Sequence, residues 1–353
     1  MTPRDPTPTS PQLPRRPRLA PGRSVLWRSP DCVQLGLHAA HAVVLDGLPV
    51  PLAALVRGMD GTLGTAALLA RAVADGADRA DALAVIGELH RAGLVVDDAG
   101  AQGATPTAPG TDVASWSMST GRPAPELLAG RRAATVYVNG SGRVAVALAT
   151  SLAAAGVGRV VPDATGTVRA ADLGTGYLPA DVGRPRGQAV RDVLRRCVPS
   201  VRTDIASGRG EPDVAVLADA VVPAPASALD LVVARTPHLA VYAHEGVAVI
   251  GPLVLPGRSA CLRCVQLRRG DADPAWPKLA AQLSSAVPSA DLGCTQVAAA
   301  MAVEQVLAVL AGPVTGLDAP PTWNATLELD PVRGLLHRRE WAAHPRCGCG
   351  AAP

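Results

Sequence analysis

The feature that most constrains this chain is a pair of short cysteine motifs that lie far apart in the sequence. Cys261 and Cys264 form a Cys-x-x-Cys doublet, and Cys347 and Cys349 form a Cys-x-Cys doublet near the C-terminus. Four thiolates held by two tight turns complete a tetrahedral zinc shell. Because sulfur would fill every position, we expect a structural zinc that ties the tail to the body of the domain. The alternatives are four buried thiols, a disulfide, or a shell in which His344 replaces one thiolate.

The composition is typical of a globular protein with two or three domains, because the chain has 353 residues and 48% of them are hydrophobic. No uninterrupted apolar stretch is long enough to span a membrane. No apolar segment follows the Pro- and Arg-containing N-terminus, as one would in a secretory signal. We therefore expect a cytoplasmic protein. Its net charge of +3 is dispersed along the chain, which does not favour a nucleic-acid partner.

Three further cysteines, Cys32, Cys197 and Cys294, are predicted to be free thiols, because disulfides are rare in the cytoplasm. Free cysteine behaves as a small buried hydrophobe, and we expect that role for all three. Cys294 has an alternative role as a nucleophile. It precedes a predicted helix over residues 295–311, and a helix N-terminus lowers the pKa of a nearby thiol.

The chain divides into an arm, two compact units and a linker. Residues 1–23 are rich in Pro, Thr and Arg and are predicted to be a disordered arm. Residues 24–98 combine short strands with three helical patterns and a closing strand, which favours a winged-helix-like α+β domain. Residues 99–130 contain mainly small and polar residues and are predicted to be a linker. Residues 131–353 alternate strands with helices, as in a parallel sheet with helices on its faces.

The first predicted strand of the second unit covers residues 133–139, and a glycine-rich turn follows it. Gly140-Ser141-Gly142-Arg143-Val144-Ala145 opens a helix, the context of a nucleotide-binding fingerprint. Gly140 permits the tight turn and Gly142 lets the backbone approach a phosphate, while the helix N-terminus offers unpaired N–H groups. The alternative is a turn that only joins strand to helix.

Acidic residues end the next two predicted strands. Asp163 follows the strand over residues 158–162, where an acid that binds ribose is expected, and Asp219 ends the strand over residues 213–219. In an open α/β sheet, ligands bind at this edge. We predict that Asp219 either holds magnesium or caps the turn that follows it.

The order of these motifs resembles the ThiF-like, ubiquitin-activating family. The glycine loop, Gly156-Val157-Gly158, residues 181–186, Val214–Asp219 and both cysteine doublets follow that order. Residues 251–264 and 273–277 look more narrowly like the branch found beside YcaO cyclodehydratases in azol(in)e-modified peptide pathways. The resemblance implies a Rossmann-like, ThiF-type domain with a zinc lobe, an N-terminal PqqD-like element that binds the leader of a precursor peptide, and a homodimer.

The chain departs from the catalytic members of that family, which adenylate a C-terminal glycine. Where they have Asn-Leu followed by Arg, this chain has Asp172-Leu173 and no Arg; Arg186 stands at the position of their Lys. Asp163 and Asp219 match the ribose and magnesium acids. Adenylation needs fixed positive charge near the phosphates, so we expect a weakened or dead site for ATP and magnesium. The residues of that site are Gly140, Gly142, Arg143, Asp163, Arg186 and Asp219.

The resemblance implies that the chain is a leader-peptide-binding scaffold, which presents a ribosomal precursor peptide to a separate YcaO-type cyclodehydratase without adenylating it. We expect the peptide to add a strand to an edge of the N-terminal sheet, at Val33–Leu37 or Val43–Leu45, facing the helix over residues 78–92. The alternative is an active ATP-dependent adenylyltransferase acting on a ubiquitin-like or sulfur-carrier protein.

Overall fold

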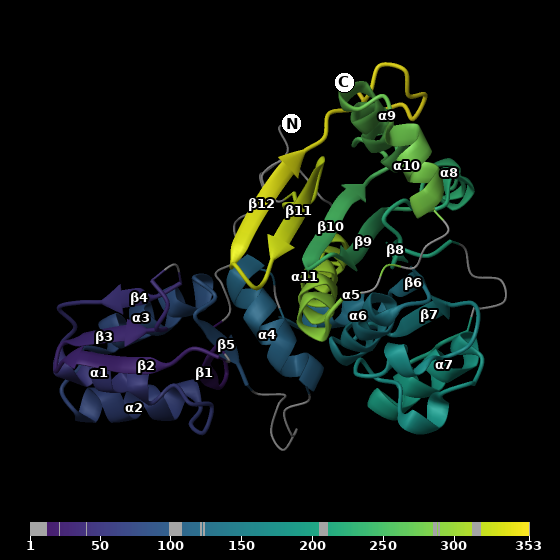
Figure 1. The fold of residues 1–353 in the computed structure, drawn as a ribbon. Helices are drawn as coiled ribbons and strands as arrows, with labels where there is room; N and C mark the ends of the chain where they lie inside the picture. The colour runs from purple at the N-terminus through teal and green to yellow at the C-terminus, as the bar shows by residue number, and fades with distance from the viewer. Residues whose placement is uncertain are drawn as a thin grey trace, which may run out of the picture. The chain divides into compact units, whose positions relative to one another are not determined.

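The computed structural model describes residues 13–20, 22–39, 41–98, 108–120, 122, 124–204, 211–284, 288, 290–312 and 319–352. The chain forms two compact units, Met1–Leu127 and Leu128–Pro353 (Figure 1). The boundary between them falls inside the predicted linker, three residues before its end.

In its described residues, the first unit contains two small antiparallel sheets and four complete helices. Its elements in chain order are β1 (Pro17–Leu19), β2 (Val25–Ser29), β3 (Cys32–Leu35), β4 (Val43–Leu45), α1 (Val50–Arg57), α2 (Thr65–Ala74), α3 (Arg79–Arg91), β5 (Val95–Asp97) and α4 (Ala108–Thr120). Leu35, Met59, Leu68 and Ile86 are the largest fully buried side chains of its core. The predicted order of strands, three helices and a closing strand is confirmed, and the winged-helix classification stays a prediction.

Local sequence signals set the bounds of α3. The Asp78 carboxylate accepts hydrogen bonds from the N–H groups of Ala80 (2.7 Å) and Asp81 (3.2 Å), which otherwise lack partners at a helix start. Gly93 follows the last turn with a φ of 68°, the left-handed conformation that glycine adopts at low cost. The chain can therefore reverse directly into β5.

The order of strands in the three-stranded sheet is β2-β3-β4. β3 pairs with β2 on one side and with β4 on the other, so its backbone groups are used by both neighbours. The prediction that Val33–Leu37 forms a free edge is therefore wrong, whereas Val43–Leu45 does lie at an edge.

Two segments predicted to lack structure are ordered. Pro17–Leu19 forms β1, which pairs antiparallel with β5, and Leu19 packs on the core. The arm prediction is wrong for these residues because β5 needs a partner strand; residues 1–12 and 21 lie outside the described residues. The predicted linker contains α4 and most of α5 (Ala124–Ala133). Alanine favours helix, and the buried side chains of Val113 and Leu127 anchor these two helices.

The second unit is built on a seven-stranded sheet in the order β12-β11-β10-β9-β8-β6-β7 (Figure 1). The strands are β6 (Thr135–Asn139), β7 (Arg159–Asp163), β8 (Val214–Ala218), β9 (His238–His244), β10 (Val247–Val254), β11 (Ala325–Asp330) and β12 (Leu335–Glu340). β7, β6, β8 and β9 are parallel, as predicted. β10, β11 and β12 continue the sheet antiparallel. Hairpins that the strand–helix alternation did not indicate join β9 to β10 and β11 to β12, whereas three helices lie between β10 and β11 in the sequence.

Helices cover this sheet. They are α6 (Arg143–Ala154), α7 (Arg186–Cys197), α8 (Pro225–Val233), α9 (Leu262–Ala272), α10 (Trp276–Leu283) and α11 (Leu292–Leu310). α11 packs against α6, β9 and β10. Among the described helices, α11 is long and apolar enough to cross a membrane by composition, but 50% of that stretch is buried inside the unit. It thus has the character of a core helix.

The sheet has one topological switch point. β6 pairs with β7 on one side and with β8 on the other, so the connections that leave β6 and β7 diverge at their carboxyl ends. In open parallel sheets this divergence forms the ligand-binding crevice. The glycine loop after β6, Asp163 at the end of β7 and Asp219 after β8 all lie at this edge.

Candidate functional site

The two cysteine doublets meet in the second unit. The sulfur of Cys261 lies 3.8 Å from that of Cys264 and 3.6 Å from that of Cys347. The sulfurs of Cys264 and Cys349 are 3.6 Å apart, and all four lie within 4.8 Å of one another. A tetrahedral zinc with bonds of about 2.3 Å to sulfur has S···S edges of about 3.8 Å. The predicted meeting of the doublets is confirmed, and the donor set and its spacing fit zinc.

Two of the alternatives, a disulfide and a shell that includes His344, do not match this geometry, and the third does not match in full because Cys347 and Cys349 are only half-buried. All four cysteines are free thiols. The distances between their sulfurs are much longer than the S–S bond of a disulfide, which is about 2.05 Å. His344 is directed elsewhere, since its Nε2 lies 2.7 Å from the Asp271 carboxylate. The four sulfurs, without His344, are therefore the candidate metal ligands.

Hydrogen bonds from α9 hold the C-terminal tail against the first doublet. Arg268 donates to the carbonyl of Ala343 (2.8 Å), and the Asp271–His344 contact lies one turn further along α9. Burial raises the pKa of the Cys261 thiol well above its usual range and that of Cys347 to about 11. Without a metal, the raised pKa values favour the protonated thiols. A bound dication such as zinc favours the thiolates instead, because thiolates are its ligands.

At the switch point, the carboxylate of Asp219 occupies the N-terminus of α6. It accepts hydrogen bonds from the backbone N–H groups of Gly142 (2.8 Å), Val144 (3.1 Å) and Ala145 (3.1 Å). These are the groups that a bound phosphate would use. Asp219 is 5% exposed, and burial raises its pKa despite the three hydrogen bonds. Of its two predicted roles, Asp219 performs a capping role, but at α6 rather than in the turn that follows it.

The glycines of the loop are required by close approaches within the chain. A Cβ on Gly140 would lie 2.8 Å from the Ala145 Cβ, and one on Gly142 would lie 2.6 Å from a carboxylate oxygen of Asp219. We predicted that Gly142 admits a phosphate; here it admits the carboxylate of Asp219. Arg143, the first residue of α6, has a buried Nε with no hydrogen-bond partner among the described residues.

We expect Gly142→Ala to lower the free energy of unfolding of the second unit by about 1–3 kcal/mol, because the new methyl group must displace the Asp219 carboxylate. Gly270→Ala is the matched control, since Gly270 lies in α9 and a Cβ there meets no atom within 4 Å. It should leave stability unchanged or slightly increased. Urea denaturation of both variants measures the difference, and equal effects would contradict this assignment.

The two remaining predicted residues are engaged by neighbours. Asp163 accepts hydrogen bonds from the Tyr137 hydroxyl and from Asn139 Nδ2 (2.8 Å). Arg186 is 9% exposed and donates to the Asp172 carboxylate through Nη2 (2.7 Å) and Nε (3.2 Å). The positive charge of Arg186 is therefore neutralised by an acid of the same chain.

Sequence reasoning missed two tyrosines in this crevice. Burial raises the pKa of Tyr177 to about 12, and the side chain lies within electrostatic range of Arg186, Asp172 and Asp219. Burial and the Asp163 carboxylate raise the pKa of Tyr137 to about 12. The chain has only three tyrosines, and this scarcity was the one available signal.

The other three cysteines divide between two environments. Cys32 and Cys294 are buried, as predicted, whereas Cys197 at the end of α7 is exposed, so the prediction is wrong for Cys197. Burial raises the pKa of the Cys294 thiol. This direction is opposite to that of an activated nucleophile.

No family model matches the chain, and no curated protein matches it. Among solved structures, E. coli MccB crystallised with AMPCPP and MccA superposes with a TM-score of 0.71 at 15% identity, over 95% of this chain and 99% of that chain. MccB with ATP gives a TM-score of 0.69 at 15% identity, with the same coverage of both chains. PaaA gives 0.65 at 14% identity, over 90% of this chain and 98% of that chain. The chain therefore shares the fold of MccB over most of its length.

Proposed function

We propose that this protein is a ThiF-like scaffold that binds a precursor peptide through its N-terminal unit, presents it to a separate YcaO-type cyclodehydratase, and does not itself adenylate. The observation that carries the proposal is that the N-terminus of α6, where a phosphate would bind, is already occupied by a side chain of the same protein. The carboxylate of Asp219 takes the three backbone N–H groups at the start of α6. A nucleotide phosphate needs the same groups.

Electrostatics support the same conclusion. Stabilising a transferring phosphoryl or adenylyl group requires positive charge that is fixed and unpaired. Arg186 is paired with Asp172 and also donates to the Thr165 carbonyl (3.2 Å). Beyond the Arg186–Asp172 pair, Asp163 and Asp219 add two carboxylates to the crevice, which repel a polyphosphate unless a metal ion intervenes.

Peptide binding by the proposed scaffold uses the free edge of β4. Val43–Leu45 pairs with β3 on one side, and no described strand pairs with its other side. An extended peptide added there gains main-chain hydrogen bonds along its length. MccB, called a microcin C7 biosynthetic enzyme, has been crystallised in complex with N-formylated MccA, and its likeness in fold to this chain supports a peptide as the partner.

A proline scan of β4 tests this edge. N–H groups of successive residues point to opposite sides of a strand, so Val43→Pro and Val44→Pro remove different N–H groups, one facing β3 and one facing the free edge. We expect peptides selected from a phage library on the full-length protein to bind one of these variants about tenfold more weakly without a change in melting temperature. Val44→Thr keeps every N–H group and should bind normally. Undiminished binding by both proline variants would contradict the edge assignment.

The second candidate function is an active adenylyltransferase that acts on a ubiquitin-like or sulfur-carrier protein. It is favoured by the likeness in fold to MccB crystallised with ATP and by the gathering of the glycine loop, Asp163 and Asp219 at one crevice. Pyrophosphate exchange separates the two functions. In either case we propose that the four cysteines hold a structural zinc and that the cytoplasmic protein is a homodimer, which light scattering can measure.

A further inference from the structure

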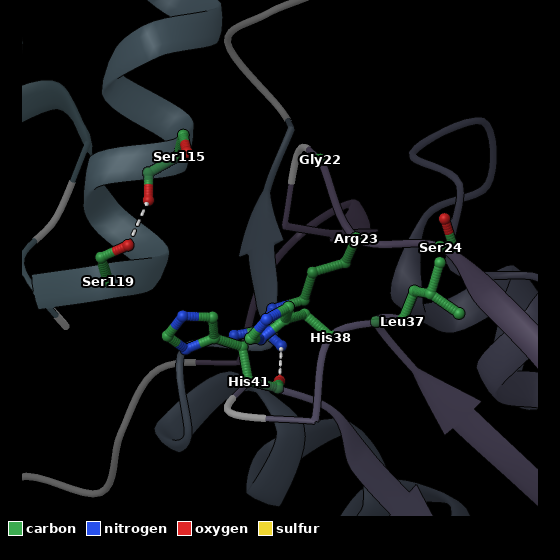
Figure 2. Close-up of a pocket in the computed structure, with 9 residues that line it drawn as sticks. Gly22, Arg23, Ser24, Leu37, His38, His41, Ser115 and Ser119 are labelled. Atoms are coloured by element: carbon green, nitrogen blue, oxygen red, sulfur yellow. Dashed lines mark hydrogen bonds between the residues drawn. The ribbon is translucent and has the colours of Figure 1, made fainter. Parts of the chain in front are cut away.

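A polar pocket of about 450 Å³ lies in the first unit, at the end of its three-stranded sheet. It is formed where β2 begins, where β3 ends and where β4 begins, and α4 closes one side (Figure 2). None of the nine residues that line it is acidic. They are Gly22, Arg23, Ser24, Gly36, Leu37, His38, His41, Ser115 and Ser119.

Arg23 supplies a permanent positive charge to this pocket. Its Nη1 donates to the carbonyl of His41 (2.8 Å), which holds the guanidinium in place. Its Nε is buried and has no hydrogen-bond partner among the described residues. An orphaned donor of this kind is costly and calls for an acceptor. A carboxylate is the acceptor whose two oxygens match the guanidinium fork.

The other polar groups of the pocket are also suited to an anion. The rings of His38 and His41 lie with centroids 5.9 Å apart, beside the guanidinium (Figure 2). Ser115 and Ser119 contribute hydroxyls from α4, with the Ser119 hydroxyl donating to the Ser115 carbonyl (3.3 Å). The two imidazoles and the Ser115 hydroxyl can donate hydrogen bonds to an anion, whereas the single O–H of Ser119 is already engaged. With one guanidinium as its fixed charge, the pocket favours an anion over a cation.

We infer that this pocket binds a carboxylate. The inference rests on the proposed function for its source: the carboxylate is an acidic side chain of the bound peptide. His41 stands two residues before β4. A strand added to the free edge of β4 therefore runs toward the pocket, and an Asp or Glu just beyond the paired segment reaches Arg23.

The first test asks whether the pocket binds a carboxylate at all. Full-length protein with ¹³C-labelled histidine is titrated with glutarate and, at equal ionic strength, with chloride, and His38→Asn and His41→Asn assign the two signals. We expect a saturable shift of both signals with glutarate alone. Arg23→Gln should raise the dissociation constant about tenfold or more, the value of a charge-assisted hydrogen bond. Arg28→Gln, an exposed arginine of β2 outside the pocket, should not. Absence of a glutarate-specific shift, or equal shifts in Arg23→Gln, would overturn the inference.

The second test identifies the source of the carboxylate. Random peptides displayed on phage are selected on wild-type protein and on Arg23→Gln. Enrichment of Asp and Glu on the wild type alone supports the acidic peptide. Peptides without an acidic preference, or with the same preference on Arg23→Gln, overturn it while the peptide-binding function stands. If glutarate binds but no peptide is enriched, the carboxylate pocket stands and the proposed function fails.

Discussion

Cys261→Ser and Cys349→Ser are each expected to reduce the zinc content from one ion per chain to none and to unfold the zinc lobe. The sulfurs of Cys261 and Cys347 lie 3.6 Å apart, as do those of Cys264 and Cys349. Each substitution removes one of these four ligands and leaves the tetrahedral shell incomplete. The binding free energy of a structural zinc, about 10–16 kcal/mol in small zinc-finger peptides, is also folding free energy. We therefore expect the melting temperature of the second unit to fall by more than about 10 °C.

Metal analysis by mass spectrometry and calorimetry of the purified variants measure both effects. Cys197→Ser is the matched control, because Cys197 is an exposed free thiol on α7. It should keep one zinc and the wild-type melting temperature. One zinc per chain in both Cys261→Ser and Cys349→Ser would show that the sulfur cluster is not the metal site.

The second large effect is expected at Asp219. Asp219→Ala leaves three N–H groups at the start of α6 without their acceptor. Each unsatisfied group costs about 1–3 kcal/mol when buried. Loss of the unfavourable buried charge offsets part of that cost, so we expect a net destabilisation of about 2–4 kcal/mol. Asp230→Ala removes an exposed acid from α8 and serves as the control.

Hydrogen exchange followed by mass spectrometry locates this effect. The backbone amides of Gly142, Val144 and Ala145 should exchange faster in Asp219→Ala, while amides of α9 should not change. Gly142→Ala should also cost less in the Asp219→Ala background than in the wild type, because the oxygen 2.6 Å from the added Cβ is gone. Additive effects of the two substitutions, or unchanged exchange at α6, would mean that Asp219 does not cap this helix.

The cysteine cluster and the glycine loop could be predicted from the sequence because their signals are local. Two cysteines in one turn can only present two adjacent sulfurs, and a strand, Gly-x-Gly and a helix describe one continuous turn of chain. The partner of each feature is distant. Asp219 lies 77 residues from Gly142, and no sequence pattern indicated that its carboxylate would accept hydrogen bonds from the loop.

The same distinction explains the errors in the fold. Composition predicts the strands of the first unit but not their order, so the expectation that β3 lies at an edge is wrong and β3 is central. Pro17–Leu19 becomes a strand only because β5 lies beside it. The sequence does not predict α4 and α5, because their small residues are also typical of linkers. The burial of Leu127 depends on tertiary contacts that the sequence alone does not show.

The proposed function depends most on closure of the nucleotide site by the chain's own side chains. Pyrophosphate exchange by the full-length protein with ATP and magnesium, measured with and without a phage-selected peptide, tests that closure most directly. We predict no exchange above the rate without protein and no heat of ATP binding in a parallel titration. Exchange that rises with protein concentration would show that Asp219 and Arg186 release their partners to a nucleotide, and that the protein is an adenylyltransferase.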